Sequence, residues 1–172
     1  MLASVARVLR HGLAGAEKVF FVLANTCLLA MLALNVVNIA WRGIVDQSLN
    51  FVWPWTGLLF VWMSFFGFFI VYRRAKDITV DFFVDLAGPR ARHITRLLSD
   101  IIIVALMVLL LAEAPRTLAS QVGDMELIEL QRYWMSVPLF VSAALVGLHF
   151  LLDLIDALRG VPEVRKHFDL PD

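Results

Sequence analysis

Four long stretches of the chain are almost wholly apolar, and shorter polar segments separate them. A hydrocarbon core about 30 Å thick needs roughly 20 helical residues to cross it, and each stretch is long enough. None alternates apolar and polar positions as a membrane β-strand would, whereas a helix satisfies its own backbone amides without water. The pattern therefore predicts an all-α integral membrane protein, a single membrane domain over residues 1–172, with four transmembrane helices. The predicted spans are residues 19–41, 51–72, 94–112 and 133–155.

The distribution of basic residues orients these helices. Most of the 15 lysines and arginines lie in the N-terminal segment, in the loop between the second and third spans, or after the fourth span. The other side holds only Arg42, Arg116 and Arg132. The positive-inside rule then predicts that both termini and the second loop lie in the cytoplasm. Aromatic residues, which gather at membrane interfaces, mark the predicted outer surface: Trp41, Trp53, Trp55, Tyr133 and Trp134.

Two segments outside the spans carry helical patterns of their own. In residues 2–13, leucine and valine recur at helical spacing, which predicts a short N-terminal amphipathic helix on the inner leaflet. A frayed terminus is the alternative. The second loop has few turn residues before Pro89, which predicts a helical cytoplasmic loop whose Asp77, Asp81 and Asp85 share one face. These carboxylates could bind a metal ion, but a solvated face beside the arginines is the favoured interpretation.

Composition supports the membrane class and excludes several functions. Of the 172 residues, 60% are hydrophobic and 17% charged, against roughly 45–50% and about 25% in soluble domains. The formal net charge is zero, so charge gives no reason to expect a nucleic-acid partner. The single cysteine, Cys27, cannot form an internal disulfide, and no Cys/His cluster has metal-ligand spacing. We therefore expect no metal, no cofactor and no enzymatic activity.

Ionisable residues near the end of the fourth span form a stripe. His149, Asp153 and Asp156 lie one helical turn apart on one face. Burying such a group costs about 2.5–3.5 kcal/mol at a helix centre on insertion scales, so a paired structural contact is favoured over a proton path. The predicted partners of Asp153 or Asp156 are arginines of the second loop and third span, namely Arg73, Arg74 or Arg96.

Other polar and small residues within the spans are predicted to join helices. Asp100 follows Arg96 by one turn in the third span, which predicts an intrahelical ion pair. In the fourth span, Ala143 and Gly147 allow close approach of a neighbouring helix. Amides in the first span can hydrogen-bond to adjacent helices; they are Asn25, Asn35 and Asn38.

Several short motifs occur in a characteristic order along the chain. They are Asn35–Val37 near the outer end of the first span, the aromatic Leu59–Gly67 segment of the second, Ile78–Asp81 with Phe82–Asp85 in the loop, and Tyr133–Pro138 before the fourth. Together with length and topology, these motifs resemble the small, DctQ-like permease subunit of a tripartite ATP-independent periplasmic (TRAP) transporter. The resemblance covers about residues 20–158.

The resemblance implies an accessory role in the bacterial inner membrane. Such subunits pair with a large permease subunit that holds the substrate and sodium sites, while a periplasmic binding protein delivers the substrate, often an organic acid. The small subunit enlarges the stationary scaffold of an elevator transporter and is surrounded by membrane lipid. We expect structural or partner contacts from Asn35, Asn38, Trp62, Gly67, Asp81, Asp85, Asp100, His149, Asp153 and Asp156.

The sequence departs from the usual family pattern in two places. An acidic pair commonly precedes the second helix, whereas here Trp53 and Pro54 stand at that point, and Asp77 replaces the usual loop histidine.

Two other functions stay open. A haem-binding respiratory membrane anchor needs at least one and usually two intramembrane histidines, and only His149 qualifies. The second is a small self-contained transporter, although no paired Gly/Pro-interrupted helices mark a substrate site.

Overall fold

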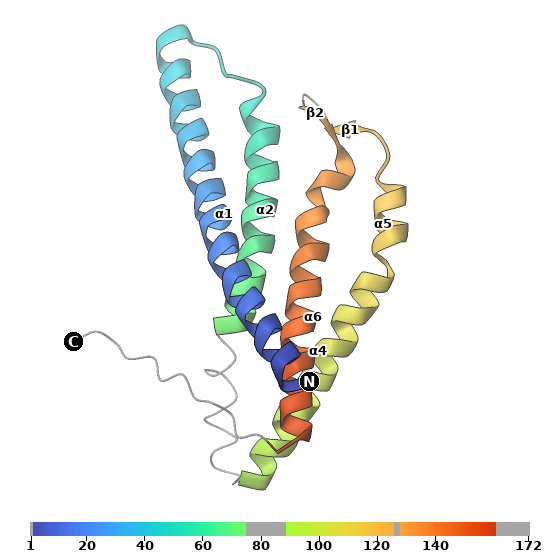
Figure 1. The fold of residues 1–172 in the computed structure, drawn as a ribbon. Helices are drawn as coiled ribbons and strands as arrows, with labels where there is room; N and C mark the ends of the chain where they lie inside the picture. Colours follow the sequence, from blue (N-terminus) through green and yellow to red (C-terminus); the bar gives the residue numbers. More distant parts are fainter. Residues whose placement is uncertain (1, 75–88, 126–127, 161–172) are drawn as a thin grey trace, which may run out of the picture.

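The structure, a computed structural model, describes residues 2–74, 89–125 and 128–160. Within these ranges, four helices are long and apolar enough to cross a membrane, which confirms the predicted fold class. The elements in chain order are α1 (Leu2–Val45), α2 (Val52–Arg74), α4 (Pro89–Ala112), α5 (Ala114–Ser120), β1 (Asp124–Met125), β2 (Ile128–Gln131), the 3₁₀ helix η2 (Arg132–Met135) and α6 (Val137–Leu158) (Figure 1). The predicted helical loop with Asp81 and Asp85 lies outside the described residues.

Helix α1 is a single rod of 44 residues, about 66 Å long at 1.5 Å per residue. The N-terminal segment is helical as predicted, but it is continuous with the first span and is no separate amphipathic helix. Its apolar face is directed at the other helices, since Leu13 is only 3% exposed and Leu9 packs against the same core. This face therefore packs against the other helices, and the segment is the beginning of the first long helix.

Local chemistry explains where two of the helices stop. Helix α1 ends at Val45 because Asp46 adopts a left-handed conformation, with φ of 57°, and its N–H donates to the carbonyl of Arg42 at 3.0 Å. Helices α4 and α5 are separated at Glu113, where Pro115 lacks an N–H and its ring crowds the carbonyl four residues earlier. The chain beyond this break continues in the same general direction (Figure 1).

A small antiparallel hairpin, β1–β2, was not predicted. Asp124 is opposite Gln131 and Met125 is opposite Ile128, and the N–H of Arg132 donates to the carbonyl of Gly123 at 3.0 Å. Gly123 has φ of 107°, which a residue with a side chain rarely adopts. The strands have two and four residues, too few for an alternating pattern to be recognised.

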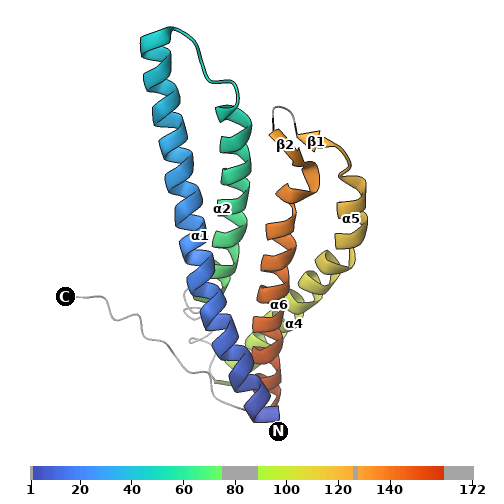
Figure 2. The same ribbon diagram turned by 45° about the horizontal axis from the view of Figure 1, so that its top comes forward.

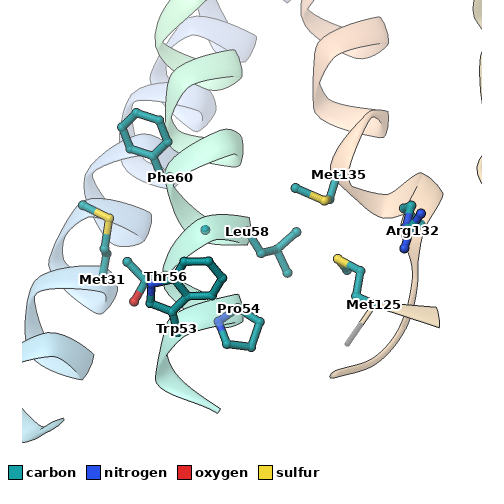
Figure 3. A pocket seen from close by; sticks show the side chains of 10 residues that line it. Met31, Trp53, Pro54, Thr56, Leu58, Phe60, Met125, Arg132 and Met135 are labelled. Carbon is teal, nitrogen blue, oxygen red and sulfur yellow. The ribbon is translucent and has the colours of Figure 1, made fainter. Parts of the chain in front are cut away.

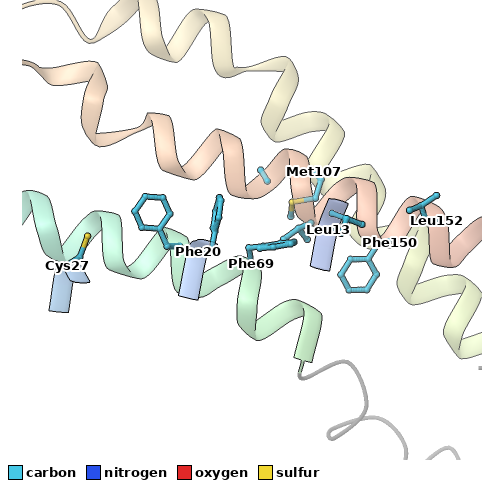
Figure 4. Packing of buried hydrophobic residues seen from close by; sticks show 10 residues of the cluster. Leu13, Phe20, Cys27, Phe69, Met107, Phe150 and Leu152 are labelled. Carbon is cyan, nitrogen blue, oxygen red and sulfur yellow. The ribbon is translucent and has the colours of Figure 1, made fainter. Parts of the chain in front are cut away.

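The four long helices pack as two pairs joined through α2 and α6. Helix α1 packs on α2, α4 on α6, and α2 on α6. The ring of Phe20 meets those of Phe66 and Phe69 edge-on, at centroid distances of 5.1 and 5.4 Å. Gly147 has the close neighbour that was predicted, since a Cβ there would lie 3.1 Å from Cβ of Met107. Figure 4 shows this core, which comprises Leu13, Phe20, Cys27, Phe66, Phe69, Met107, Ala143, Val146, Phe150 and Leu152.

The two helix pairs converge at one end and separate toward the other (Figures 1 and 2). We call the first end, where α1 and α4 begin and α2 and α6 end, the base. The opposite end, which carries β1 and β2, is the hairpin end. The buried core lies toward the base because the helices are closest together there, and the pairs are more widely spaced at the hairpin end.

Candidate functional site

At the base, one carboxylate binds two arginines and joins α1 to the last turn of α2. Glu17 lies 3.1 Å from Nε of Arg73 and accepts a hydrogen bond of 2.7 Å from Nε of Arg74. The side chains of Glu17 and Arg73 are 16% and 13% exposed, whereas Arg74 is 59% exposed. Because surface ion pairs contribute little, the partly buried contact with Arg73 is the stronger of the two.

A second ionic contact at the base joins α1 to the last turns of α6. Arg10 donates a hydrogen bond to Asp156 and lies 3.9 Å from Oδ1 of Asp153. Asp153 in turn lies 3.5 Å from Nε2 of His149, one turn earlier in α6. The three residues of the predicted stripe therefore form one polar cluster with the start of α1.

The partners within these contacts differ from those predicted for Asp156. In the described part of the chain its guanidinium partner is Arg10 of α1, and the predicted partners Arg73 and Arg74 both bind Glu17. Charge and periodicity predicted that the acidic stripe lies at the same end of the bundle as Arg73 and Arg74, which the structure shows. They did not show that α1 extends to the base and brings its own charged residues between α2 and α6.

Asp100 is the most deeply buried acidic residue of the described chain, with none of its surface exposed. It lies in α4, on the turn after the partly buried Arg96. The intrahelical pair between these two residues stays a prediction. The predicted contact residues Asp81 and Asp85 lie outside the described residues.

Nearer the hairpin end, two asparagines of α1 make the contacts between α1 and the segment that follows it. Nδ2 of Asn35 donates to Oγ1 of Thr56 in α2 at 3.1 Å, as predicted, and to the carbonyl of Met31 at 2.7 Å. Oδ1 of Asn38 accepts a hydrogen bond of 2.8 Å from the N–H of Leu49, in the connection to α2. These contacts hold α1 and α2 together where the aromatic core has ended.

Two further hydrogen bonds join α2 to the second helix pair. Nε1 of Trp62 donates to the carbonyl of Trp134 in η2 at 2.9 Å. The fully buried Ser142 of α6 donates to the carbonyl of Phe65 at 2.7 Å. Sequence analysis singled out Trp62 but missed Ser142, because a lone serine in an apolar helix carries no distinguishing pattern. Gly67, also expected to make a contact, has space for a Cβ with no atom within 4 Å.

The described residues contain no group of three histidine, cysteine or acidic side chains that could hold a metal ion. At the base, Arg10 and Glu17 of α1 instead pair with charged side chains of α6 and α2. These contacts join helices to one another. The sequence matches, over residues 21–160, the family described as tripartite ATP-independent periplasmic transporters, DctQ component. The chain belongs to the DctQ family. A search among curated proteins found no match.

The DctQ match includes most of α1 and the whole of α2, α4 and α6. It therefore makes this chain a multi-pass membrane component of a transporter. Two residues of the base, Arg10 and Glu17, precede the matched region. The family resemblance therefore could not have shown the two ionic contacts that fix the start of α1 to α2 and α6.

Proposed function

We propose that this chain is the accessory small membrane subunit of a tripartite secondary transporter. It enlarges the stationary scaffold of a large permease subunit during ion-coupled uptake of an organic acid that a periplasmic binding protein delivers. The observation that carries the proposal is the DctQ match over residues 21–160. A large permease and a binding protein are the partners that membership of this family implies.

The outer surfaces of the helices support a role inside a membrane complex. Large apolar side chains are exposed along both α1 and α4, the two helices at the outside of the pairs. Examples are Leu29 at 64% and Leu109 at 65% exposure. Exposed apolar area on this scale needs lipid or another membrane subunit to cover it.

Contacts between the helices support the stationary part of this role. A scaffold must keep its helices in fixed positions while another component moves. Glu17 fixes α1 to α2, Arg10 fixes α1 to α6, and Ser142 fixes α6 to α2. Because these contacts involve three of the four long helices, separating any one of them would break a charged or buried polar interaction.

For the orientation, we propose that the base faces the cytoplasm and that the protein lies in the inner membrane. Basic residues of the described chain gather at or near the base; they are Arg7, Arg10, Lys18, Arg73, Arg74, Arg96 and Arg159. Toward the hairpin end lie Arg42, Arg116 and Arg132. An excess of this kind favours the cytoplasmic side, and we propose that both termini lie there.

The test is to express the chain with and without a large TRAP permease subunit from the same organism, purify each form and reconstitute it in liposomes. We expect co-purification of the two subunits, and uptake only when both are present together with the binding protein and a sodium gradient. Uptake by this polypeptide alone would contradict the proposal and support a self-contained transporter. A haem spectrum in the purified chain would instead support a respiratory membrane anchor.

A further inference from the structure

An open groove of about 550 Å³ lies at the hairpin end, between the α1–α2 pair and the segment from β1 to η2. Its volume is within the range of about 300–1,000 Å³ typical of small-molecule sites. Figure 3 shows side chains from both sides directed toward this space. The lining residues are Met31, Trp53, Pro54, Thr56, Gly57, Leu58, Phe60, Met125, Arg132 and Met135.

Arg132 lies among apolar side chains in the groove. Figure 3 shows Arg132 at about the depth of Leu58 on α2. Trp53 and Pro54 lie nearer the hairpin end, and Phe60 lies further toward the base. Arg132 is the one charged residue among the described residues of the lining. The hydroxyl of Thr56 already accepts the hydrogen bond from Asn35, so the rest of the lining is essentially apolar.

Aromatic residues typical of a membrane interface lie in or beside the groove. Trp53, at the start of α2, is 87% exposed, and the stacked rings of Tyr133 and Trp134 follow Arg132 directly. Aromatic residues of this kind gather at the level of lipid headgroups. An arginine beside these aromatic residues, with apolar side chains lining the rest of the groove, complements the anionic phosphate and the apolar chains of a phospholipid.

We propose that this groove binds one phospholipid molecule. Its phosphate lies against the guanidinium of Arg132, and an acyl chain runs along α2 between Met31 and Phe60. Arginine binds phosphate oxygens through charge-assisted hydrogen bonds, and methionine side chains adapt to a flexible apolar ligand, which Met125 and Met135 supply. The lipid would fill the space between the two helix pairs where protein contacts become sparse.

The test is a titration of the purified full-length chain with phosphatidylglycerol, followed by native mass spectrometry. Diacylglycerol with the same acyl chains, which lacks the phosphate, is the ligand control. Arg132→Gln removes the cation, and Arg116→Gln on α5 is its matched control because Arg116 does not line the groove. Gly57→Leu fills the groove, and Gly67→Leu on the same helix is its control, since a Cβ meets no atom within 4 Å at either position.

We expect one phosphatidylglycerol per chain, bound about tenfold more tightly than diacylglycerol. Arg132→Gln should weaken binding about tenfold, as expected for one charge-assisted contact, and Gly57→Leu should abolish it. Both control variants should bind like the unmodified chain. The proposal would be overturned if the Arg132→Gln and Gly57→Leu variants bound phosphatidylglycerol as tightly as the unmodified chain does, with unchanged thermal unfolding. A photoreactive residue at Phe60 that captures the large permease, and not lipid, in the assembled complex would also overturn it.

Discussion

The two ends of this molecule are built on different principles. At the base, charged residues of α1 form ion pairs with residues of α2 and α6, next to a buried core that contains aromatic rings packed edge-on. At the hairpin end the pairs diverge (Figure 1), and an open apolar groove lies between them. Ionic contacts and buried rings thus join the helices at the base, whereas the hairpin end has an open space between the helix pairs. The comparison indicates that contacts between the two helix pairs are concentrated at the base.

The largest expected effect concerns the side of the membrane on which each end lies. In a variant whose buried Cys27 is replaced by alanine, single cysteines at Asn50 and Val122 should react fully with a membrane-impermeant thiol reagent added to the periplasm. Val122 is 82% exposed at the hairpin end. A cysteine at Ala87, between α2 and α4, should react only after the inner membrane is opened. The reverse pattern at either end would contradict the orientation.

The next effect tests the base. Glu17→Gln leaves Arg73, whose side chain is 13% exposed, without its carboxylate. Removing one member of a fully buried pair costs about 3–5 kcal/mol, and partial exposure lowers this to about 1–3 kcal/mol. We expect a lower thermal unfolding temperature of the purified protein in detergent. Glu113→Gln is the control, because Glu113 is exposed at the junction of α4 and α5.

A smaller effect is expected where α6 meets α2, between the base and the hairpin end. Ser142→Ala removes the hydroxyl that donates to the carbonyl of Phe65, so this partly buried carbonyl loses that hydrogen bond. We expect the free energy of unfolding to fall by about 1–2 kcal/mol. Ser64→Ala is the matched control, since Ser64 is exposed and its hydroxyl bonds within α2 to Phe60. If the two variants unfold at the same temperature, the Ser142 contact does not help to hold the pairs together.

The sequence predicted the transmembrane helices well because each depends on a long apolar run, which is a property of the chain itself. The break before α5 could have been foreseen, since Pro115 cannot continue the hydrogen-bond ladder of α4. The two-residue strand β1 could not, because so short an element has no periodicity. The partners of Asp156 and Arg73 depended on where the first turns of α1 lie in space, which no local pattern encodes.

The groove was beyond sequence reasoning for the same physical reason. Met31, Phe60 and Arg132 come from three elements, and each looks ordinary in its own segment. Their proximity follows from the angle between the two helix pairs, which depends on the packing of the whole core. Asn35, in contrast, was correctly predicted to bond a neighbouring helix. Asn25, predicted on the same grounds, donates instead to the carbonyl of Phe21 in its own helix. An amide inside an apolar span needs a partner, but the sequence does not decide whether that partner lies in the same helix.

The smallest expected effect decides what the acidic stripe of α6 is for. Asp156→Asn removes the ion pair with Arg10, whose side chain is 48% exposed, so the loss should be only about 0.5 kcal/mol. Asp153→Asn and His149→Ala should likewise lower the stability or yield of the complex. In the complex that does assemble, uptake and substrate affinity should stay close to those of the unmodified transporter, because a scaffold contact does not touch the substrate.

A proton path through the same residues predicts the opposite result, in which assembly is normal and uptake is lost. Asp153→Asn and His149→Ala would then give a complex that assembles and unfolds normally but has lost transport. The matched control for charge alone is Asp124→Asn, an exposed aspartate at the hairpin end.

Arg10→Gln combined with Asp156→Asn gives the sharper result: if the two residues act through their ion pair, the double variant should be no less stable than either single variant. Additive losses would show that Asp156 contributes through another neighbour, and normal assembly without uptake would show that the stripe takes part in transport.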